Sequence, residues 1–293
     1  MEKKTILITG ATSGIGKAAA KALAKEGHRI IVHGRNEAKA QAVREEIIAE
    51  TGNDDIDVVI ADLLLMSNVK RMAAEIKERY DRLDVLINNA GTMMNKEREV
   101  TQEGLEKTIA LNLLAPFLLI ESLLDTLSKS PDARIINVSS IMHKFSGKPH
   151  FDDFLLENDY SSGKAYGLSK LYLIWVSRRW AAELKQKGFE HMTVNIAHPF
   201  ISNTNFGRGS KKGLFIDTIF RIGIPLSLSP EKGAESIIYL ASSDEVKGVT
   251  GQFYGTKKKL DKVKEKYHSA ENEQKVWDFC KEITKPYLDD PAE

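Results

Sequence analysis

Cysteine is nearly absent from this sequence of 293 residues, which contains a single Cys280. One cysteine permits no internal disulfide, and this fits a reducing compartment. The seven histidines are scattered without the spacing of metal ligands, so the sequence indicates no metal centre. Internal repeats, low-complexity segments and domain linkers are also missing. The chain is therefore expected to fold as one large unit.

Long apolar runs and a strong net charge are missing too. The first apolar stretch, residues 5–9, is too short for a signal sequence or a membrane span. The formal net charge of +1 gives no reason to expect nucleic acid or an acidic membrane as partner. Lysines 257–259 are followed by interleaved acids, which favours a solvated helical face over a basic patch. These features predict a cytoplasmic globular protein without an integral membrane segment, and leave a homo-oligomer open.

Strand-like and helix-like segments alternate along the chain. Strands are expected at residues 5–9, 28–33, 56–61, 83–91, 133–140, 193–197 and 252–254, and helices at 17–26, 37–50, 67–79, 103–127, from about 166 onward and at 230–242. This alternation predicts right-handed crossovers and a parallel sheet covered on both faces. The expected fold is α/β, a single-domain Rossmann-type doubly wound sheet of about seven mostly parallel strands. Residues 1–255 would form this domain, and residues 256–293 a helical extension packed on it.

The first predicted strand leads into a glycine-rich loop and then an alanine-rich helix. Gly10, Gly14 and Gly16 have the spacing G-x-x-x-G-x-G, with Ser13 and Ile15 between them. Glycines let the backbone approach a pyrophosphate, and a helix N-terminus offers unpaired N–H groups and a positive dipole end. The segment predicts a dinucleotide site, although glycine-rich turns without a ligand also occur.

The end of the second predicted strand distinguishes between two cofactors. An acidic residue there would bind the adenosine ribose hydroxyls, whereas an arginine would receive a 2′-phosphate. No Asp or Glu occurs between His28 and Asn36, and Arg35 lies beside Asn36, with Lys17 as a candidate second cation. These residues favour NADP(H) over NAD(H). The alternative is that Arg35 is a solvated loop charge.

Two further strand ends carry candidate cofactor contacts. Asp62, followed by Leu63, lies where adenine would pass, and its carboxylate would accept a hydrogen bond from the adenine amino group unless it caps a helix. Asn89, Ala90 and Gly91 end the fourth strand. The small residues would let the nicotinamide ribose lie against the backbone, and Asn89 is expected to brace neighbouring strands.

A tyrosine and a lysine four residues apart begin a long helical pattern. Tyr166 and Lys170 would lie on the same helix face. A free tyrosine titrates near ~10, and a nearby cation lowers its pKa towards the range of a general acid/base. Tyr160 and Lys164 have the same spacing, but Gly163 and the adjacent serines predict a poor helix there. We therefore assign the acid/base pair to Tyr166 and Lys170.

Asn112, two serines and an apolar loop complete the candidate site. Pro116 predicts a local break in the helix at 103–127 that would free the Asn112 carbonyl to hold a water, the alternative being a capping or solvent-facing asparagine. Ser139 and Ser140 end the fifth strand, where a parallel sheet opens onto its ligand crevice. Residues from about 200 to 228 mix apolar side chains with glycines, which predicts a mobile lid over a hydrophobic substrate or, equally, a docking helix.

In their order and spacing these motifs resemble those of the short-chain dehydrogenase/reductase family, and the match covers nearly the whole chain. Residues 9–16 (TGATSGIG) resemble its cofactor loop, residues 88–91 (NNAG) its strand-four motif, and Tyr166 with Lys170 its catalytic pair. The resemblance implies that Ser140, rather than Ser139, is the catalytic serine. It also implies that Asn112 is the asparagine of a catalytic tetrad.

Two longer segments resemble the retinol dehydrogenase-like branch of this family. They are the loop between Ser140 and Tyr166, with its sequence FDD at 151–153, and the ending GQFY at 251–254 with Trp277 downstream. That branch typically uses NADP(H). Two departures are the missing membrane-anchoring N-terminal segment and the sequence Pro-Phe at 199–200 in place of Pro-Gly. Ile201 is expected to contact the nicotinamide amide.

The implied activity is hydride transfer between NADP(H) and the carbonyl or alcohol group of a hydrophobic substrate, such as an aldehyde, a ketone, or a retinoid- or steroid-like molecule. Tyr166 would donate the proton, Lys170 would lower the tyrosine pKa and hold the nicotinamide ribose, and Ser140 would bind the substrate oxygen. Asn112 would anchor a water in the proton path. Two alternatives are a cofactor-sensing regulatory protein on the same fold and a pigment ring reductase, for which the expected cysteines are missing.

Overall fold

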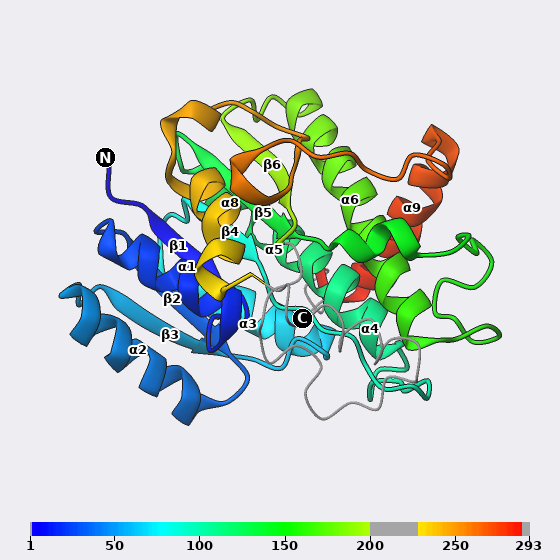
Figure 1. The fold of residues 1–293 in the computed structure, drawn as a ribbon, viewed down its shortest axis with the longest axis horizontal. Helices are drawn as coiled ribbons and strands as arrows, with labels where there is room; N and C mark the ends of the chain where they lie inside the picture. Colours follow the sequence, from blue (N-terminus) through cyan, green and yellow to red (C-terminus); the bar gives the residue numbers. More distant parts are fainter. Residues whose placement is uncertain (1, 200–227, 289–293) are drawn as a thin grey trace, which may run out of the picture.

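A seven-stranded parallel sheet forms the centre of the molecule in the computed structural model, which describes residues 2–199 and 228–288 (Figure 1). The strand order is β3-β2-β1-β4-β5-β6-β7, and every neighbouring pair is parallel. The strands are β1 (Thr5–Ile8), β2 (Arg29–Gly34), β3 (Ile56–Ile60), β4 (Val85–Asn88), β5 (Ala133–Val138), β6 (Met192–Ala197) and β7 (Phe253–Tyr254). The predicted Rossmann-type fold is confirmed.

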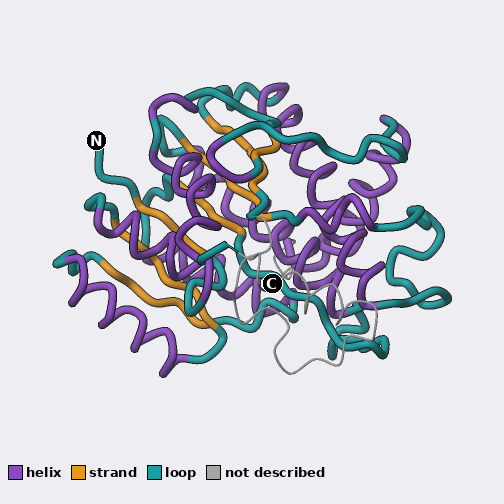
Figure 2. Tube along the Cα trace, viewed as in Figure 1, coloured by secondary structure: helices purple, strands orange, loops and turns teal. Residues whose placement is uncertain are grey.

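Helices cover both faces of this sheet (Figure 2). The α-helices are α1 (Gly14–Lys25), α2 (Glu37–Thr51), α3 (Met66–Arg79), α4 (Lys107–Ile109), α5 (Ala115–Ser128), α6 (Ser162–Gln186), α8 (Pro230–Ser242) and α9 (Ala270–Leu288). A π-turn, η1 (Ala110–Leu114), joins α4 to α5, and single 3₁₀ turns form η2 (Ile141–Phe145), η4 (Asp244–Val246) and η5 (Thr256–Lys258). None of these described helices is long and apolar enough to cross a membrane.

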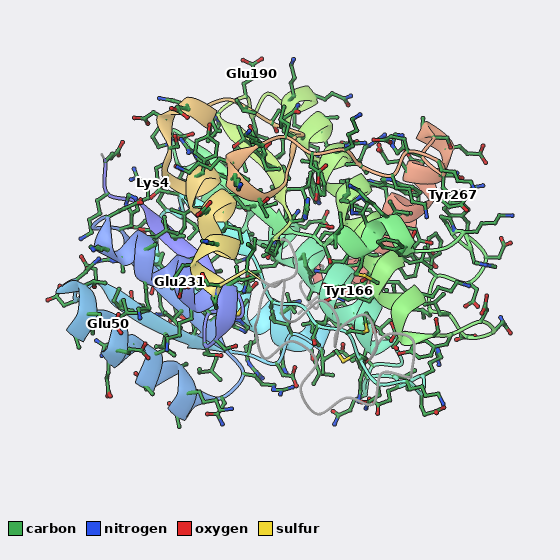
Figure 3. All side chains as sticks on the ribbon, in the orientation of Figure 1. Lys4, Glu50, Tyr166, Glu190, Glu231 and Tyr267 are labelled. Atoms are coloured by element: carbon green, nitrogen blue, oxygen red, sulfur yellow. The ribbon has the colours of Figure 1, made fainter. Side chains whose placement is uncertain are left out.

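Two hydrophobic cores lie on opposite sides of the sheet because successive strand residues point to opposite faces. Ile6 and Ile8 of β1 pack in one core with α1, α2 and α8, whereas Leu7 packs in the other with α3, α5 and α6. The strands are therefore buried on both faces, which explains why they read as continuous apolar runs. In Figure 3 the labelled Glu50 and Glu190 lie near the outline of the molecule, whereas Tyr166, which is buried, lies away from it.

Two predicted helix boundaries are wrong. The helix expected at 103–127 begins only at Lys107, because Glu106 accepts hydrogen bonds from the backbone N–H groups of Thr108 and Ile109 and so caps α4. The long helix begins at Ser162, since the Ser161 hydroxyl accepts a hydrogen bond from the Lys164 N–H. The break predicted in the first of these helices is present, as the π-turn that contains Asn112.

After the single 3₁₀ turn η5, the C-terminal part is helical again only from Ala270. Residues 259–269 form a loop, so the expected solvated helical face after Thr256 is not formed there. In α9 the Trp277 ring lies 5.1 Å from the Phe117 ring of α5 and 4.9 Å from the Trp180 ring of α6, between ring centres. These aromatic contacts attach α9 to the core on the α5 and α6 side of the sheet.

Candidate active site

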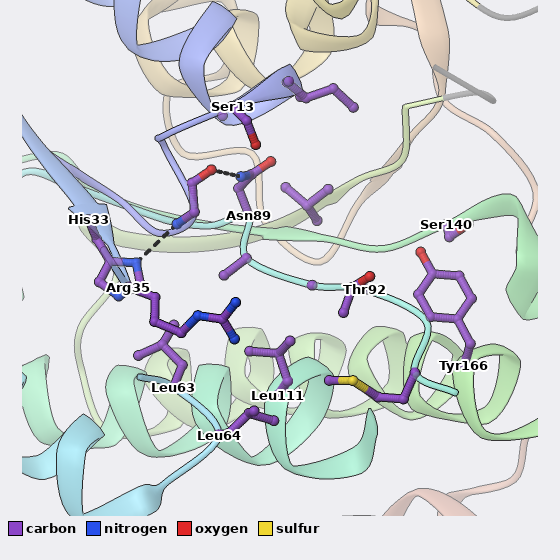
Figure 4. Close-up of a pocket in the computed structure, with 18 of the residues that line it drawn as sticks. Ser13, His33, Arg35, Leu63, Leu64, Asn89, Thr92, Leu111, Ser140 and Tyr166 are labelled. Carbon is purple, nitrogen blue, oxygen red and sulfur yellow. Dashed lines mark hydrogen bonds between the residues drawn. The ribbon is translucent and has the colours of Figure 1, made fainter. Parts of the chain in front are cut away.

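A cavity of about 590 Å³ opens at the carboxyl ends of the strands, where open α/β sheets bind their ligands (Figure 4). Its lining comes from the glycine loop, the ends of β2, β3, β4 and β5, η2 and α6. Most of the residues predicted for the cofactor and catalytic sites meet here: Gly10, Ser13, Gly14, Ile15, Gly16, Arg35, Asp62, Leu63, Asn89, Ala90, Gly91, Ser140, Tyr166 and Lys170.

The glycine loop packs so closely that side chains are excluded at two positions. Gly10 has a φ of +66°, and a Cβ there would lie 2.9 Å from the Ala90 Cα. A Cβ on Gly16 would lie 2.4 Å from the Asn89 Nδ2 and 2.5 Å from the Gly10 oxygen. Ser13 precedes α1 and its side chain does not cap the helix. The first N–H groups of α1 are therefore left uncapped at the cavity. This arrangement fits a pyrophosphate.

Asn89 joins the glycine loop to the end of β4. Its Nδ2 donates to the Thr9 oxygen at 2.9 Å and to the Gly10 oxygen at 3.2 Å. The Thr9 hydroxyl in turn accepts from the backbone N–H of Asn89 at 2.9 Å and of Ala90 at 3.0 Å. The bracing role predicted for Asn89 is therefore visible in its hydrogen bonds.

Arg35 lines the cavity at the end of β2, and residues 28–36 contain no Asp or Glu. The preceding Gly34 packs so closely against Thr12 that a Cβ on Gly34 would lie 2.4 Å from the Thr12 Cγ2. Lys17 does not join Arg35, since its ammonium pairs with Glu46 of α2 at 2.5 Å. Asn36 is not among the lining residues: its Oδ1 caps α2 by accepting from the Lys39 N–H at 2.9 Å.

Asp62 lies between the two roles predicted for it. Its Oδ1 accepts from the Leu64 N–H at 3.1 Å, which is a local turn contact. The residue still lines the cavity together with Leu63 and Leu64. The first turn of α3 takes its cap from elsewhere, because the Glu103 carboxylate accepts from the N–H groups of Met66 and Ser67.

His33 is a site residue that the sequence reasoning missed. Its Nδ1 accepts from the Gly10 N–H at 3.0 Å, and its Nε2 lies 3.1 Å from the Ala61 oxygen. Because a carbonyl only accepts, Nε2 carries the proton and Nδ1 is free to accept. Burial lowers the His33 pKa to about 4, so the ring is neutral at pH 7. A histidine in an otherwise apolar strand was the only signal in the sequence.

Tyr166, Ser140 and Lys170 meet at the inner end of the cavity. Ser140 lies beside the Tyr166 hydroxyl (Figure 4), and a side-chain hydrogen bond with Ser140 acts to lower the Tyr166 pKa. The Lys170 ammonium donates to the Val138 oxygen at 2.9 Å and lies 5.8 Å from the centre of the Tyr166 ring. Ser139 has a different use, because its buried hydroxyl donates to the Lys170 main-chain oxygen at 3.0 Å.

The pKa shifts of this pair differ from the prediction. Burial raises the Tyr166 pKa to about 12, opposed by the bond with Ser140. Burial also lowers the Lys170 pKa to about 7. Desolvation therefore sets the direction of both pKa shifts, which sequence spacing alone did not reveal. A dinucleotide phosphate or a developing negative charge nearby would favour protonated Lys170.

Asn112 is completely buried beside Lys170. Its amide exchanges two hydrogen bonds with the backbone of Thr92, at 3.1 and 3.0 Å, and donates to the Ser169 hydroxyl at 3.1 Å. A Cβ on Gly91 would lie 2.8 Å from the Asn112 Oδ1 and 2.9 Å from the Lys170 Nζ, so a glycine is needed between them. The solvent-facing alternative for Asn112 is wrong.

The competing Tyr-x-x-x-Lys pair has structural contacts. The Tyr160 hydroxyl donates to the Asn95 oxygen at 2.9 Å, and Lys164 pairs with Asp159 at 2.5 Å. Neither residue lines the cavity. Ile201 and the proposed lid at 200–228 lie outside the described residues, except that residue 228 is described.

The comparisons with known proteins agree with this geometry. Residues 4–213 match the family model described as short chain dehydrogenase. Human retinol dehydrogenase 14 is 35% identical over 95% of this chain and 85% of its own length, and human polyprenol dehydrogenase is 34% identical over 96% and 85%. The chain belongs to the short-chain dehydrogenase/reductase family. Within it, the predicted membership of the retinol dehydrogenase-like branch is confirmed.

Solved structures of this fold include complexes with either nicotinamide cofactor. A short-chain dehydrogenase from Shigella flexneri 2a, solved with NADP, has a TM-score of 0.68 at 26% identity and covers 87% of this chain and 97% of its own. A 3-ketoacyl-(acyl-carrier-protein) reductase from Brucella melitensis, solved with NADH, has a TM-score of 0.66 at 24% identity, covers 87% and 96%, and shares the fold. The protein is thus an oxidoreductase of a nicotinamide-binding fold, acting on alcohol or carbonyl groups.

Proposed function

We propose that the protein transfers hydride between NADP(H) and the carbonyl or alcohol carbon of a hydrophobic substrate. The observation that supports the choice of cofactor is Arg35, which lines the cavity at the end of β2 where no carboxylate competes for the ribose hydroxyls. A guanidinium suits a 2′-phosphate, because charge-assisted bonds to phosphate oxygens are about twice as strong as neutral ones.

The residues around Tyr166 divide the proton chemistry among them. In reduction the Tyr166 hydroxyl gives its proton to the substrate oxygen, and Ser140 donates a hydrogen bond to the same oxygen. Lys170 holds positive charge beside them and binds the nicotinamide ribose. When bound, the cofactor supplies the hydride, and the protein supplies orientation and charge.

Asn112 has a positioning role in this scheme. In a regular α-helix its carbonyl would accept from residue 116, which is a proline and has no N–H. The π-turn at Ala110–Leu114 lies at this place. We assign the Asn112 carbonyl to a water in the proton path, while its side chain fixes Thr92 beside the cavity.

The cofactor assignment is tested by the affinity for each dinucleotide. NADPH is expected to bind more tightly than NADH by roughly 1–3 kcal/mol, the range for a hydrogen bond to a charged group. Arg35→Asp should narrow or reverse this preference, whereas Lys17→Ala should leave it unchanged, because Lys17 is occupied by Glu46. Equal dissociation constants for the two cofactors in the wild-type protein would refute the assignment.

Apolar residues support the substrate class. Met94, Leu111, Ile141 and Met142 line the same cavity as Tyr166. Each buried methylene contributes about 0.8 kcal/mol, so kcat/KM should rise by up to about fourfold per added methylene in a series of linear aldehydes. A flat or falling series, followed by nicotinamide absorbance, would contradict a hydrophobic substrate. Tight NADPH binding without turnover of any aldehyde, ketone or alcohol would favour the cofactor-sensing alternative.

A further inference from the structure

Two of the most exposed apolar side chains of the molecule occur in neighbouring loops. Among the described residues, the exposed large hydrophobic side chains are Phe145 (70% exposed), Leu260 (62%) and Val100 (45%). Phe145 ends η2, and Leu260 lies in the loop after η5. Residues 144–148 contain Phe145, and residues 257–264 contain Leu260. We call these two segments together the basic loop surface.

Direct contacts hold the two segments of the basic loop surface side by side. The Lys144 ammonium lies 3.7 Å from an Asp261 carboxylate oxygen. The Lys264 ammonium donates to the Gly147 oxygen at 3.5 Å. Phe145 is adjacent to Lys144, and Leu260 to Asp261, so the two exposed apolar side chains belong to one surface.

Positive charge dominates this surface. It contains two lysines in 144–148 and five in 257–264, against the single acid Asp261. Asp261 is already engaged, since its carboxylate bonds the buried His198 ring at 2.7 Å. The next acid, Glu265, pairs with Arg178 at 2.9 Å. Both acids that made this charge run look balanced in the sequence therefore also bind a partner outside the basic loop surface.

Several of the lysines are left available to a ligand. Lys148, Lys257, Lys259 and Lys262 are exposed and form no ion pair within the part of the chain that the structure describes. Exposed lysines that lie close together raise the local positive potential, and this potential attracts anionic surfaces.

The second loop of this surface is a fixed part of the fold. Val263 packs against Phe253, Ile174 and Ile196, whereas Leu260, three residues earlier, points into solvent. Lys257 and Lys258 have φ values of 60° and 59°, a conformation that residues other than glycine rarely adopt. The Lys258 N–H is held by the Ser236 hydroxyl at 3.0 Å. The fold thus keeps Leu260 and its neighbouring lysines outside at the cost of a strained backbone.

We propose that the basic loop surface docks the protein peripherally on an anionic lipid bilayer. Lysines would contact headgroup phosphates and carboxylates, while Phe145 and Leu260 enter the boundary between headgroups and acyl chains. A nucleic acid would use the same lysines and stack on Phe145, but would gain nothing from the aliphatic Leu260. The pairing of aliphatic and aromatic tips with lysines therefore favours lipid.

The test is co-sedimentation of the full chain with vesicles of phosphatidylcholine alone or mixed with phosphatidylserine. We expect at least about tenfold more binding to the phosphatidylserine vesicles, decreasing with added salt. Equal binding to both vesicle types, or binding to neither, would overturn the proposal. Tighter binding to a single-stranded oligonucleotide than to anionic vesicles would also overturn it.

Variants separate the charged and apolar contributions. The triple variant Lys257→Glu, Lys259→Glu, Lys262→Glu should lower the affinity for anionic vesicles about a hundredfold. Each lysine near an anionic surface contributes about fivefold in affinity, and the three contributions multiply. Phe145→Ser with Leu260→Ser should weaken binding even at low salt, while Val100→Ser, the third exposed apolar position, should not. An unaffected Phe145/Leu260 variant, or an equal loss in Val100→Ser, would contradict insertion at this surface.

Vesicle binding tests the docking proposal and turnover tests the proposed enzyme function, so a failure of one can be distinguished from a failure of the other. None of the substituted residues lines the cavity, so each variant should have the unfolding midpoint of the wild-type protein. Its turnover of a water-soluble aldehyde should stay within about twofold of wild type. Lost vesicle binding with retained turnover supports docking at this surface. Turnover lost in step with vesicle binding in these variants would instead indicate that the changes disturb the fold.

Discussion

At the scale of single residues, the proposed mechanism depends on which tyrosine gives up a proton. Tyr166→Phe keeps the ring and its packing but removes the hydroxyl that meets Ser140. Turnover should fall about 10²- to 10⁴-fold, a general acid's share of the rate, with little change in cofactor affinity. Tyr160→Phe removes the hydroxyl that donates to the Asn95 oxygen, outside the cavity, and its turnover should stay within about threefold of wild type. An inactive Tyr160→Phe beside an active Tyr166→Phe would reverse the assignment.

The sequence predicted which side chains line the cavity better than it predicted their pKa values. Spacing on one helix brought Tyr166 and Lys170 together, and the ends of parallel strands brought Ser140 and Gly91 to the same edge. The raised pKa of Tyr166 was not predictable, because a Tyr-x-x-x-Lys pattern does not report how deeply the phenol is buried. The orientation of Asn36 was not predictable either, since its side chain caps α2 and the residue does not line the cavity beside Arg35.

At the scale of elements, His33 links the glycine loop to β2 and β3, and its protonation should weaken the fold. Its pKa is lowered from 6.5 to about 4, so the unfolded chain binds the proton first as pH falls. The contribution of neutral His33 to the free energy of unfolding is therefore complete above pH 6.5. It decreases between pH 6.5 and pH 4, by up to roughly 3 kcal/mol. Burial lowers the pKa of His143 to about 4 as well, and adds a second loss over the same range.

The measurement is the free energy of unfolding in urea as a function of pH. His33→Asn keeps an acceptor near the Gly10 N–H but cannot titrate, so the pH dependence between 6.5 and 4 should become less steep. The remaining dependence would come from His28, His143 and His198, whose pKa values burial also lowers. His150→Asn, at an exposed position, should retain all of it. A His33→Asn profile as steep as wild type would show that this ring does not carry the effect.

Element boundaries were predictable where the chain carries a local signal. Ser229 and Pro230 marked the start of α8 correctly, because a serine cap and a proline in the first turn suit a helix N-terminus. The Asn112 and Pro116 pair marked a break, but not that the break is a π-turn. The start of α4 at Lys107 was missed, since it is capped by Glu106, and glutamate is not among the residues preferred at a helix N-cap.

At the scale of the whole molecule, the alternation of apolar strands and helices was enough to predict the parallel sheet and its two covered faces. The basic loop surface was not predictable, because the partners of Asp261 and Glu265 are distant in sequence. Charge runs are judged in sequence by their neighbours along the chain. In the folded molecule their balance depends on contacts across it.

The packing of α9 provides a test of how the last helix supports the rest. Trp277 is 8% exposed and lies between Phe117 and Trp180, so Trp277→Ala should cost about 3–5 kcal/mol of unfolding free energy. Phe145→Ala, at a position 70% exposed, should change it by no more than about 0.5 kcal/mol. Because Trp277 does not line the cavity, turnover should stay within about twofold wherever the variant remains folded. A stable but inactive Trp277→Ala would mean that α9 acts on the catalytic residues rather than on the core.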